Sequence, residues 1–294
     1  MESPEEVVQV FVVLKYVSAA SFMVVVFDHF ITLDDEINTI WTNPSVRLHS
    51  KAAFVVNRYL TEAISAYVVY IFSGMGTTLS TAVCRRFIWI YGITCIVAGA
   101  ISHFVILIRV YALWDRRTTV SRILMAAFTI CISTTTILGI FAAIQMHRKY
   151  SLLTAQSSAD SCTCIVAQLT YFEPLHTCVF GTKPKAITAM LGVLSLFDFF
   201  LVMLIIFNAM DRPRLTHIEI VSGLQKDGVG FFLAIFALRF ADLIISIFQS
   251  PAEVFVTITT VWGFCTILNA RLHMRLEGLS LATSQGRLIM LEDM

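Results

Sequence analysis

Long runs of apolar residues, separated by short polar segments, recur along the whole chain. A helix needs about 20 predominantly apolar residues to cross the hydrocarbon core of a bilayer, and seven runs reach that length. The pattern therefore predicts seven membrane-spanning helices. They lie near residues 7–33, 51–72, 87–113, 123–145, 186–209, 228–249 and 252–271.

The connections between these runs are too short to hold a separate soluble domain. The longest connection, residues 147–185, is rich in polar residues and is expected to be a polar loop. The sequence thus predicts an all-α polytopic membrane protein, a single seven-helix bundle over residues 1–275. A short cytoplasmic tail follows at 276–294.

Composition supports a protein that lies in lipid. Apolar residues make up 57% of the chain and charged residues only 14%, whereas soluble domains carry about 25% charged residues. The mean hydropathy is +0.79. With 21 basic and 20 acidic residues the net charge is +1, so no basic surface is available for nucleic acid. The lipid bilayer is the partner that the composition predicts.

The distribution of Lys and Arg predicts the orientation of the bundle. Cytoplasmic loops carry the excess of basic residues, and with the N-terminus outside, the inner segments hold 11 of them against six on the outer side. The start of the chain is acidic and lacks the basic n-region of a cleavable signal peptide. We therefore expect the N-terminus outside, the C-terminus in the cytoplasm and the plasma membrane as the location.

Four of the seven cysteines fall on the expected outer side, where disulfides persist. They are Cys84, just before the third span, and Cys162, Cys164 and Cys178 in the long loop. We expect a bridge from Cys84 to this loop, with the partner left open; a set of free thiols is the alternative. The loop lacks a regular metal-ligand spacing, so no metal site is predicted.

Ionisable residues inside a span are costly and mark either a structural pair or a functional site. Asp28 in the first span and Arg58 in the second lie at similar depth, given a rise of 1.5 Å per residue. We expect them to pair and to lock the first two helices together. Glu62 lies one turn beyond Arg58 and is expected to join them. A ligand or proton site is the alternative interpretation.

A second group of ionisable residues lies near mid-membrane. Asp198 in the fifth span and Arg239 in the sixth lie at matching depths, and Asp242 is one turn beyond Arg239. His103 in the third span is a further buried candidate. The group is interpreted as a structural salt bridge or as a ligand site beneath an outer vestibule.

A distinctive pattern of polar and aromatic residues lies in the first two spans and the segment between them. It reads D-x-x-x-T-L-x-x-E-I-x-x-x-W and is followed by N-R-Y, so that its residues are Asp28, Thr32, Glu36, Trp41, Asn57, Arg58 and Tyr59. Over residues 16–60 the chain resembles the fungal (basidiomycete) membrane family that contains the domain of unknown function 6533. The resemblance implies a seven-helix protein without an established activity.

The sequence contains no motif that indicates catalysis or a bound cofactor. No GxSxG elbow, P-loop or dinucleotide fingerprint occurs in a suitable context, so we expect no enzyme and no cofactor. The leading hypothesis is a receptor-like protein that senses an external small molecule or lipid and signals to a cytoplasmic partner through basic inner loops. The alternatives are a transporter or lipid-handling protein that uses the mid-membrane charges, and a structural scaffold.

Overall fold

The computed structural model describes residues 4–44, 46–74, 80–114, 117–156, 169–172, 177–180, 184–211 and 219–292. Most of them are helical. The α-helices are α1 (Pro4–Glu36), α2 (Leu48–Val55), α3 (Thr61–Phe72), α4 (Thr81–Leu113), α5 (Thr118–Gln156), α6 (Lys185–Asp211), α7 (Glu219–Phe248) and α8 (Pro251–Glu292). Two π-helical turns, η1 (Ile37–Trp41) and η2 (Val56–Leu60), and two short strands, β1 (Leu169–Phe172) and β2 (Thr177–Phe180), complete the elements.

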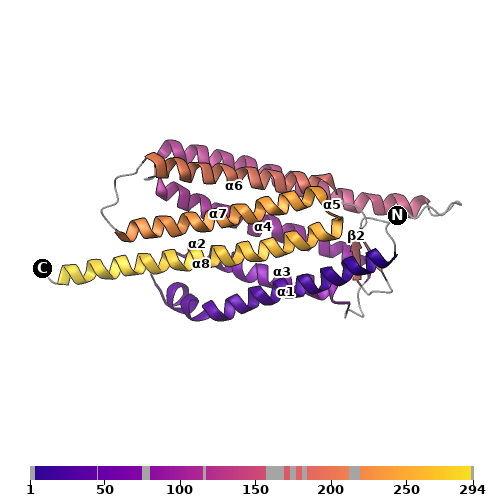
Figure 1. Ribbon diagram of the computed structural model, residues 1–294, viewed down its shortest axis with the longest axis horizontal. Helices are drawn as coiled ribbons and strands as arrows, with labels where there is room; N and C mark the ends of the chain where they lie inside the picture. The colour runs from indigo at the N-terminus through magenta and orange to yellow at the C-terminus, as the bar shows by residue number, and fades with distance from the viewer. Residues whose placement is uncertain are drawn as a thin grey trace.

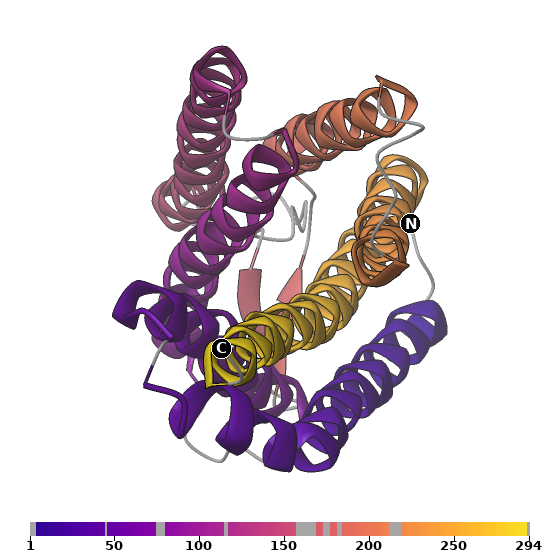
Figure 2. The same cartoon turned by 90° about the vertical axis from the view of Figure 1, so that its left-hand side faces the viewer.

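The long helices lie side by side in one elongated bundle (Figure 1). Seen along the bundle, they form a ring in which each contacts its neighbours (Figure 2). Around this ring α1 packs against α3 and α8, α4 against α5, α5 against α6, and α7 against both α6 and α8. The first and last helices of the chain therefore close the ring.

The two ends of the bundle differ. α1 begins near the end that carries β1 and β2, and α8 ends at the opposite end (Figure 1). We refer to these as the hairpin end and the C-terminal end.

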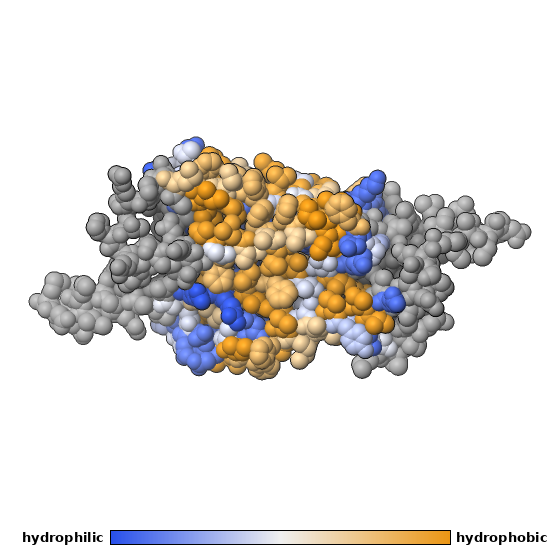
Figure 3. All heavy atoms as spheres, viewed as in Figure 1, coloured by the Kyte–Doolittle hydropathy of each residue, from blue (hydrophilic) through white to orange (hydrophobic). Residues whose placement is uncertain are grey.

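The surface of the bundle is suited to lipid. In the part of the chain that the structure describes, six helices are long and apolar enough to cross a membrane: those that contain residues 11–41, 81–111, 118–146, 185–208, 229–248 and 253–278. A broad apolar belt covers the visible middle of the molecule, with hydrophilic residues towards both ends (Figure 3). Large side chains such as Phe27, Phe30 and Ile130 are exposed on the perimeter. The chain is thus a multi-pass membrane protein.

The second predicted span is the one that does not appear among these six. Residues 48–72 are helical without a break, but the π-turn η2 divides them into α2 and α3, each of which is short. This segment also carries Lys51, Arg58 and Glu62. Among the described residues, six candidate spans together with this divided helix take the place of the seven spans that the sequence predicted.

Local signals at the helix ends explain where the chain turns. Gly74 has a φ of 72° two residues after α3, a left-handed conformation that commonly terminates helices and suits glycine. Pro251 occupies the first turn of α8, where its missing N–H costs nothing. The backbone N–H of Ser250 donates to Glu253 Oε2 at 2.9 Å, as in a capping box. Pro251 and the Ser250–Glu253 contact together favour the tight turn between α7 and α8.

The long connection that was expected to be a polar loop contains regular structure. α5 continues to Gln156, and β1 and β2 form an antiparallel hairpin in which Leu169 is opposite Phe180. The hairpin contacts α4, and Thr177 Oγ1 donates to the carbonyl of Ile71 at 3.4 Å. Four-residue strands are too short for a reliable alternating pattern, so they could hardly be predicted from the sequence.

Candidate functional site

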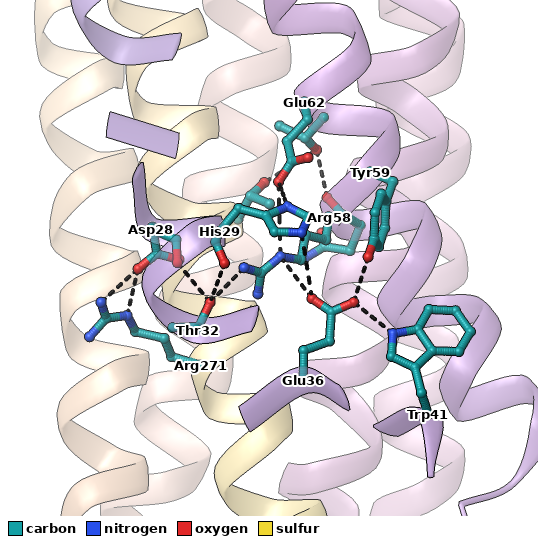
Figure 4. Close-up of polar contacts among 12 residues, drawn as sticks. Asp28, His29, Thr32, Glu36, Trp41, Arg58, Tyr59, Glu62 and Arg271 are labelled. Atoms are coloured by element: carbon teal, nitrogen blue, oxygen red, sulfur yellow. Dashed lines mark hydrogen bonds and ion pairs between the residues drawn. The ribbon is translucent and has the colours of Figure 1, made fainter. Parts of the chain in front are cut away.

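One buried carboxylate lies at the centre of a polar network (Figure 4), in the half of the bundle that is nearer to the C-terminal end. The side chain of Glu36, at the end of α1, is fully buried. Its Oε1 accepts hydrogen bonds from Trp41 Nε1 at 2.9 Å and from the Tyr59 hydroxyl at 2.6 Å. Its Oε2 lies 3.4 Å from Arg58 Nε. We call Glu36, Trp41, Arg58 and Tyr59 the Glu36 network.

Arg58 ties the divided helix to α1. Its Nη2 donates to Thr32 Oγ1 at 2.6 Å, and the guanidinium lies over the Phe54 ring at 5.7 Å from the centroid. The residue is 2% exposed, and its Nη1 has no hydrogen-bond partner among the described residues. Glu36 is the nearer of two carboxylates beside this buried guanidinium, so the stability of the buried charge depends strongly on Glu36.

The two π-turns place the members of the network. η1 inserts extra backbone directly after Glu36, and Trp41 at its end reaches back to that carboxylate. η2 contains both Arg58 and Tyr59. π-turns inside helices frequently occur at functional sites, and here both lie where α1 and the divided helix exchange buried hydrogen bonds.

His29 joins the network to Glu62. Its Nδ1 donates to Glu62 Oε1 at 2.5 Å, while its Nε2 lies 4.0 Å from Glu36 Oε2. Its ring also meets the Tyr59 ring edge-on, with 5.2 Å between centroids. Glu62 therefore joins the lock through His29, and its distance to Arg58 Nε is 3.9 Å.

The predicted pair between Asp28 and Arg58 is not formed. Asp28 Oδ1 instead accepts from Arg271 on α8, at 2.6 Å from Nη2 and 2.8 Å from Nε. Asp28 and Thr32 are one turn apart on α1, and Arg58 bonds to Thr32 rather than to Asp28. Matching depths had suggested the wrong pair because a residue count does not show that α8 also packs against α1. The lock between α1 and the divided helix is thus formed by Arg58 with Thr32 and Glu36, and by Glu62 with His29. Asp28 instead ties α1 to α8.

A stripe of polar residues on α8, missed in the sequence, extends these contacts. Ser50 Oγ donates to Glu277 Oε1 at 2.9 Å and lies 3.0 Å from His273 Nε2. Asn269 Nδ2 donates to Ser102 Oγ, and one turn earlier Thr266 Oγ1 donates to Thr61 Oγ1 on α3 at 3.3 Å. A spacing of three or four residues marks one helix face and could have revealed this stripe.

The mid-span cluster forms around Asp198 on α6. Arg239 Nη1 lies 3.1 Å from Asp198 Oδ2, and His103 Nδ1 lies 3.3 Å from Asp198 Oδ1. Arg239 Nη1 is also 2.5 Å from His103 Nε2. Because a guanidinium can only donate, Nε2 accepts and the His103 proton resides on Nδ1, facing the carboxylate. We call these three residues the central triad; it joins α4, α6 and α7.

Asp242, the fourth predicted member of this cluster, stays outside the triad. It is 4% exposed, and its Oδ1 has no hydrogen-bond partner among the described residues. Arg239, one turn earlier on α7, directs its Nη1 at Asp198 and His103. The cluster of four in the sequence therefore separates into a bonded triad and a carboxyl group without a described partner.

A disulfide fastens the hairpin to the bundle. Cys84 at the start of α4 is bridged to Cys178 in β2, with 5.8 Å between their Cα atoms. Cys162 and Cys164 lie outside the described residues. Of the described residues, no group of three or more His, Cys, Asp or Glu could hold a metal ion.

The comparisons with known proteins concern the segment that builds the Glu36 network. Residues 16–61 match DUF6533, a family of unknown function. No curated protein and no solved structure matches the chain significantly. The matched segment includes α1 from Tyr16 onward, both π-turns and all four residues of the Glu36 network.

Proposed function

We propose that this membrane protein is a receptor-like sensor. It binds an external small molecule or lipid in the hairpin half of the bundle and signals to a cytoplasmic partner at the C-terminal end. The observation that carries the proposal is the division of the buried charge into two groups, the central triad and the Glu36 network, at different depths of one bundle. Because each buried charge is costly in a membrane, two such groups favour a functional role over simple anchoring.

Three features support the orientation that this role requires. The Cys84–Cys178 bridge belongs in an oxidising compartment, which favours the hairpin end as the outer one. The excess of Lys and Arg favours the C-terminal end as the cytoplasmic one. α1 begins and α8 ends at opposite ends of the bundle (Figure 1), which favours an odd number of crossings with residues 48–72 as the seventh. The plasma membrane is the location that fits an external ligand.

A transporter or lipid-handling protein is the second candidate. It is favoured by Asp242, a carboxyl group at membrane depth with no described hydrogen-bond partner. Such groups commonly mark ion or proton pathways. A structural scaffold without a ligand is the third outcome that an experiment has to separate from these two.

A ligand screen on the purified protein tests the proposal. A molecule that binds only the folded state raises the unfolding temperature, so small metabolites and lipids are screened for this effect. The screen is repeated on Asp198→Asn and Arg239→Gln, with Arg271→Gln as the matched control outside the triad. For a sensor, we expect a molecule that raises the unfolding temperature of the wild type and of Arg271→Gln but not that of either triad variant.

Two other results would change the assignment. Ligand flux into vesicles that Asp242→Asn abolishes would replace the sensor by the transporter. No hit from the library, combined with triad variants that are merely less stable, would overturn the sensor in favour of the scaffold.

A further inference from the structure

Two aspartates of nearly equal burial lie in very different surroundings. Asp198 and Asp242 are each 4% exposed, and both lie within candidate membrane spans. Asp198 has a guanidinium at 3.1 Å and an imidazole at 3.3 Å. Asp242 Oδ1, by contrast, is buried without a hydrogen-bond partner among the residues that the structure describes.

The groups that face Asp242 offer little compensation for a negative charge. From its own helix the nearest cation is Arg239, whose Nη1 is engaged by the central triad. Among the described residues of α4 and α8, Tyr91 and Cys265 interact electrostatically with Asp242. The Tyr91 hydroxyl is 3.1 Å from Thr259 Oγ1, and Cys265 is a free thiol.

An ionised carboxylate in this position would be a buried charge without a partner, which is strongly unfavourable at membrane depth. We propose that Asp242 is a proton-binding site, occupied by an exchangeable proton in the resting protein. Its carboxyl group is then a neutral acid, whereas Asp198 is the ionised member of the pair.

Release of this proton has a structural consequence. The O–H bond breaks, the proton passes to water, and the negative charge stays on the Asp242 carboxylate. The nearest cation to that new charge is Arg239, one turn away on the same helix. Arg239 is then shared between two carboxylates, and its bonds to Asp198 and His103 weaken. The proton on Asp242 thereby controls how firmly α7 is held to α4 and α6.

This inference goes beyond the proposed function, because it holds for a sensor and for a transporter alike. In either case the proton on Asp242 makes the bonds of the central triad depend on pH. Its test uses no ligand, so its failure and the failure of the ligand screen are separate results.

Infrared difference spectroscopy on the reconstituted protein tests the proposal. The probe is deuterium exchange, because the carbonyl stretch of a protonated carboxyl group shifts when H₂O is replaced by D₂O. We expect one such band from the buried carboxyl group, absent in Asp242→Asn and retained in the matched control Asp198→Asn. In Asp242→Glu the band is expected to remain but to move.

The Glu variant keeps the test decisive if Asp242→Asn does not fold. The proposal is overturned if the wild type shows no such band, if the band survives in Asp242→Asn, or if Asp242→Glu leaves its frequency unchanged. Stability gives a second readout. Asparagine resembles a neutral acid, so Asp242→Asn is expected to lower the unfolding temperature less than Asp198→Asn, and the opposite order would contradict the proposal.

Discussion

Replacing Glu36 by glutamine removes the negative charge from the Glu36 network while keeping the shape of the side chain. The amide oxygen can still accept from Trp41 and Tyr59, which lie 2.9 and 2.6 Å from Oε1. The amide nitrogen then faces Arg58 Nε, where Oε2 lay at 3.4 Å. The glutamine N–H and the Arg58 N–H are both donors and cannot bond to each other. The Arg58 guanidinium keeps its positive charge but loses its nearest carboxylate.

The size of the effect follows from the burial of the pair. The Glu36 and Arg58 side chains are 0% and 3% exposed, so solvent cannot replace the lost partner. Removing one member of a buried pair costs about 3–5 kcal/mol. Because the pair is longer than an ideal charged hydrogen bond, we expect about 3 kcal/mol, the lower end of that range. At about 2–4 °C per kcal/mol this lowers the unfolding temperature by roughly 6–12 °C.

The assay is the unfolding temperature of the detergent-purified variants, measured side by side. Asp35→Asn is the matched control, because Asp35 is the adjacent acid on α1 and is exposed; its effect is expected to stay within about 0.5 kcal/mol. The double variant Glu36→Gln/Arg58→Met removes both charges and should recover part of the loss. A Glu36→Gln protein as stable as Asp35→Asn would refute the reasoning, as would fully additive losses in the double variant.

Three further predictions concern the other contacts. Cys84→Ser removes the bridge to the hairpin and is expected to cost about 2–5 kcal/mol and to abolish the mobility difference between reduced and non-reduced gels; Cys95→Ser, which alters a free thiol, should leave that difference intact. Arg271→Gln should lower the free energy of unfolding by at most about 1 kcal/mol, since the Arg271 side chain is 46% exposed. In a protein that already carries Asp28→Asn the same substitution should cost still less, because its partner is gone. Equal losses in both backgrounds would argue against the Asp28–Arg271 pair. Asp198→Asn is expected to lower the free energy of unfolding by about 3–5 kcal/mol, measured by thermal or denaturant unfolding. An unchanged free energy would show that the central triad contributes nothing to stability.

The general architecture could be read from the sequence because its signals are local. Runs of apolar residues long enough for a bilayer predicted the helices, and the positions of Cys84 and the loop cysteines relative to them predicted a bridge. The structure supplies the partner, Cys178. The choice among three cysteines could not be made from the sequence because it depends on a short hairpin that orients one of them.

The pairing of buried charges could be predicted only in part. Counting residues along a helix gives depth to about one turn, and this sufficed for Asp198 and Arg239, which face each other on neighbouring helices. It failed for Asp28, because depth does not show which of two neighbours a side chain faces. Asp28 faces α8 and bonds to Arg271.

The central place of Glu36 had no signal in the chain beyond its position in the family-like motif. Two neighbouring acids, Asp34 and Asp35, are exposed while Glu36 is fully buried. The π-turns that bring Trp41 and Tyr59 to Glu36 each alter the helical register, and no periodicity of 3.6 residues predicts them.

The proposed sensor requires that the two ends of the bundle lie on opposite sides of one membrane, with the hairpin end outside. The most direct measurement is the accessibility of terminal epitope tags in intact and permeabilised cells. An antibody is expected to reach an N-terminal tag in intact cells and a C-terminal tag only after permeabilisation. Both tags on the same side, or the C-terminal tag alone accessible from outside, would contradict the orientation and the sensor built on it.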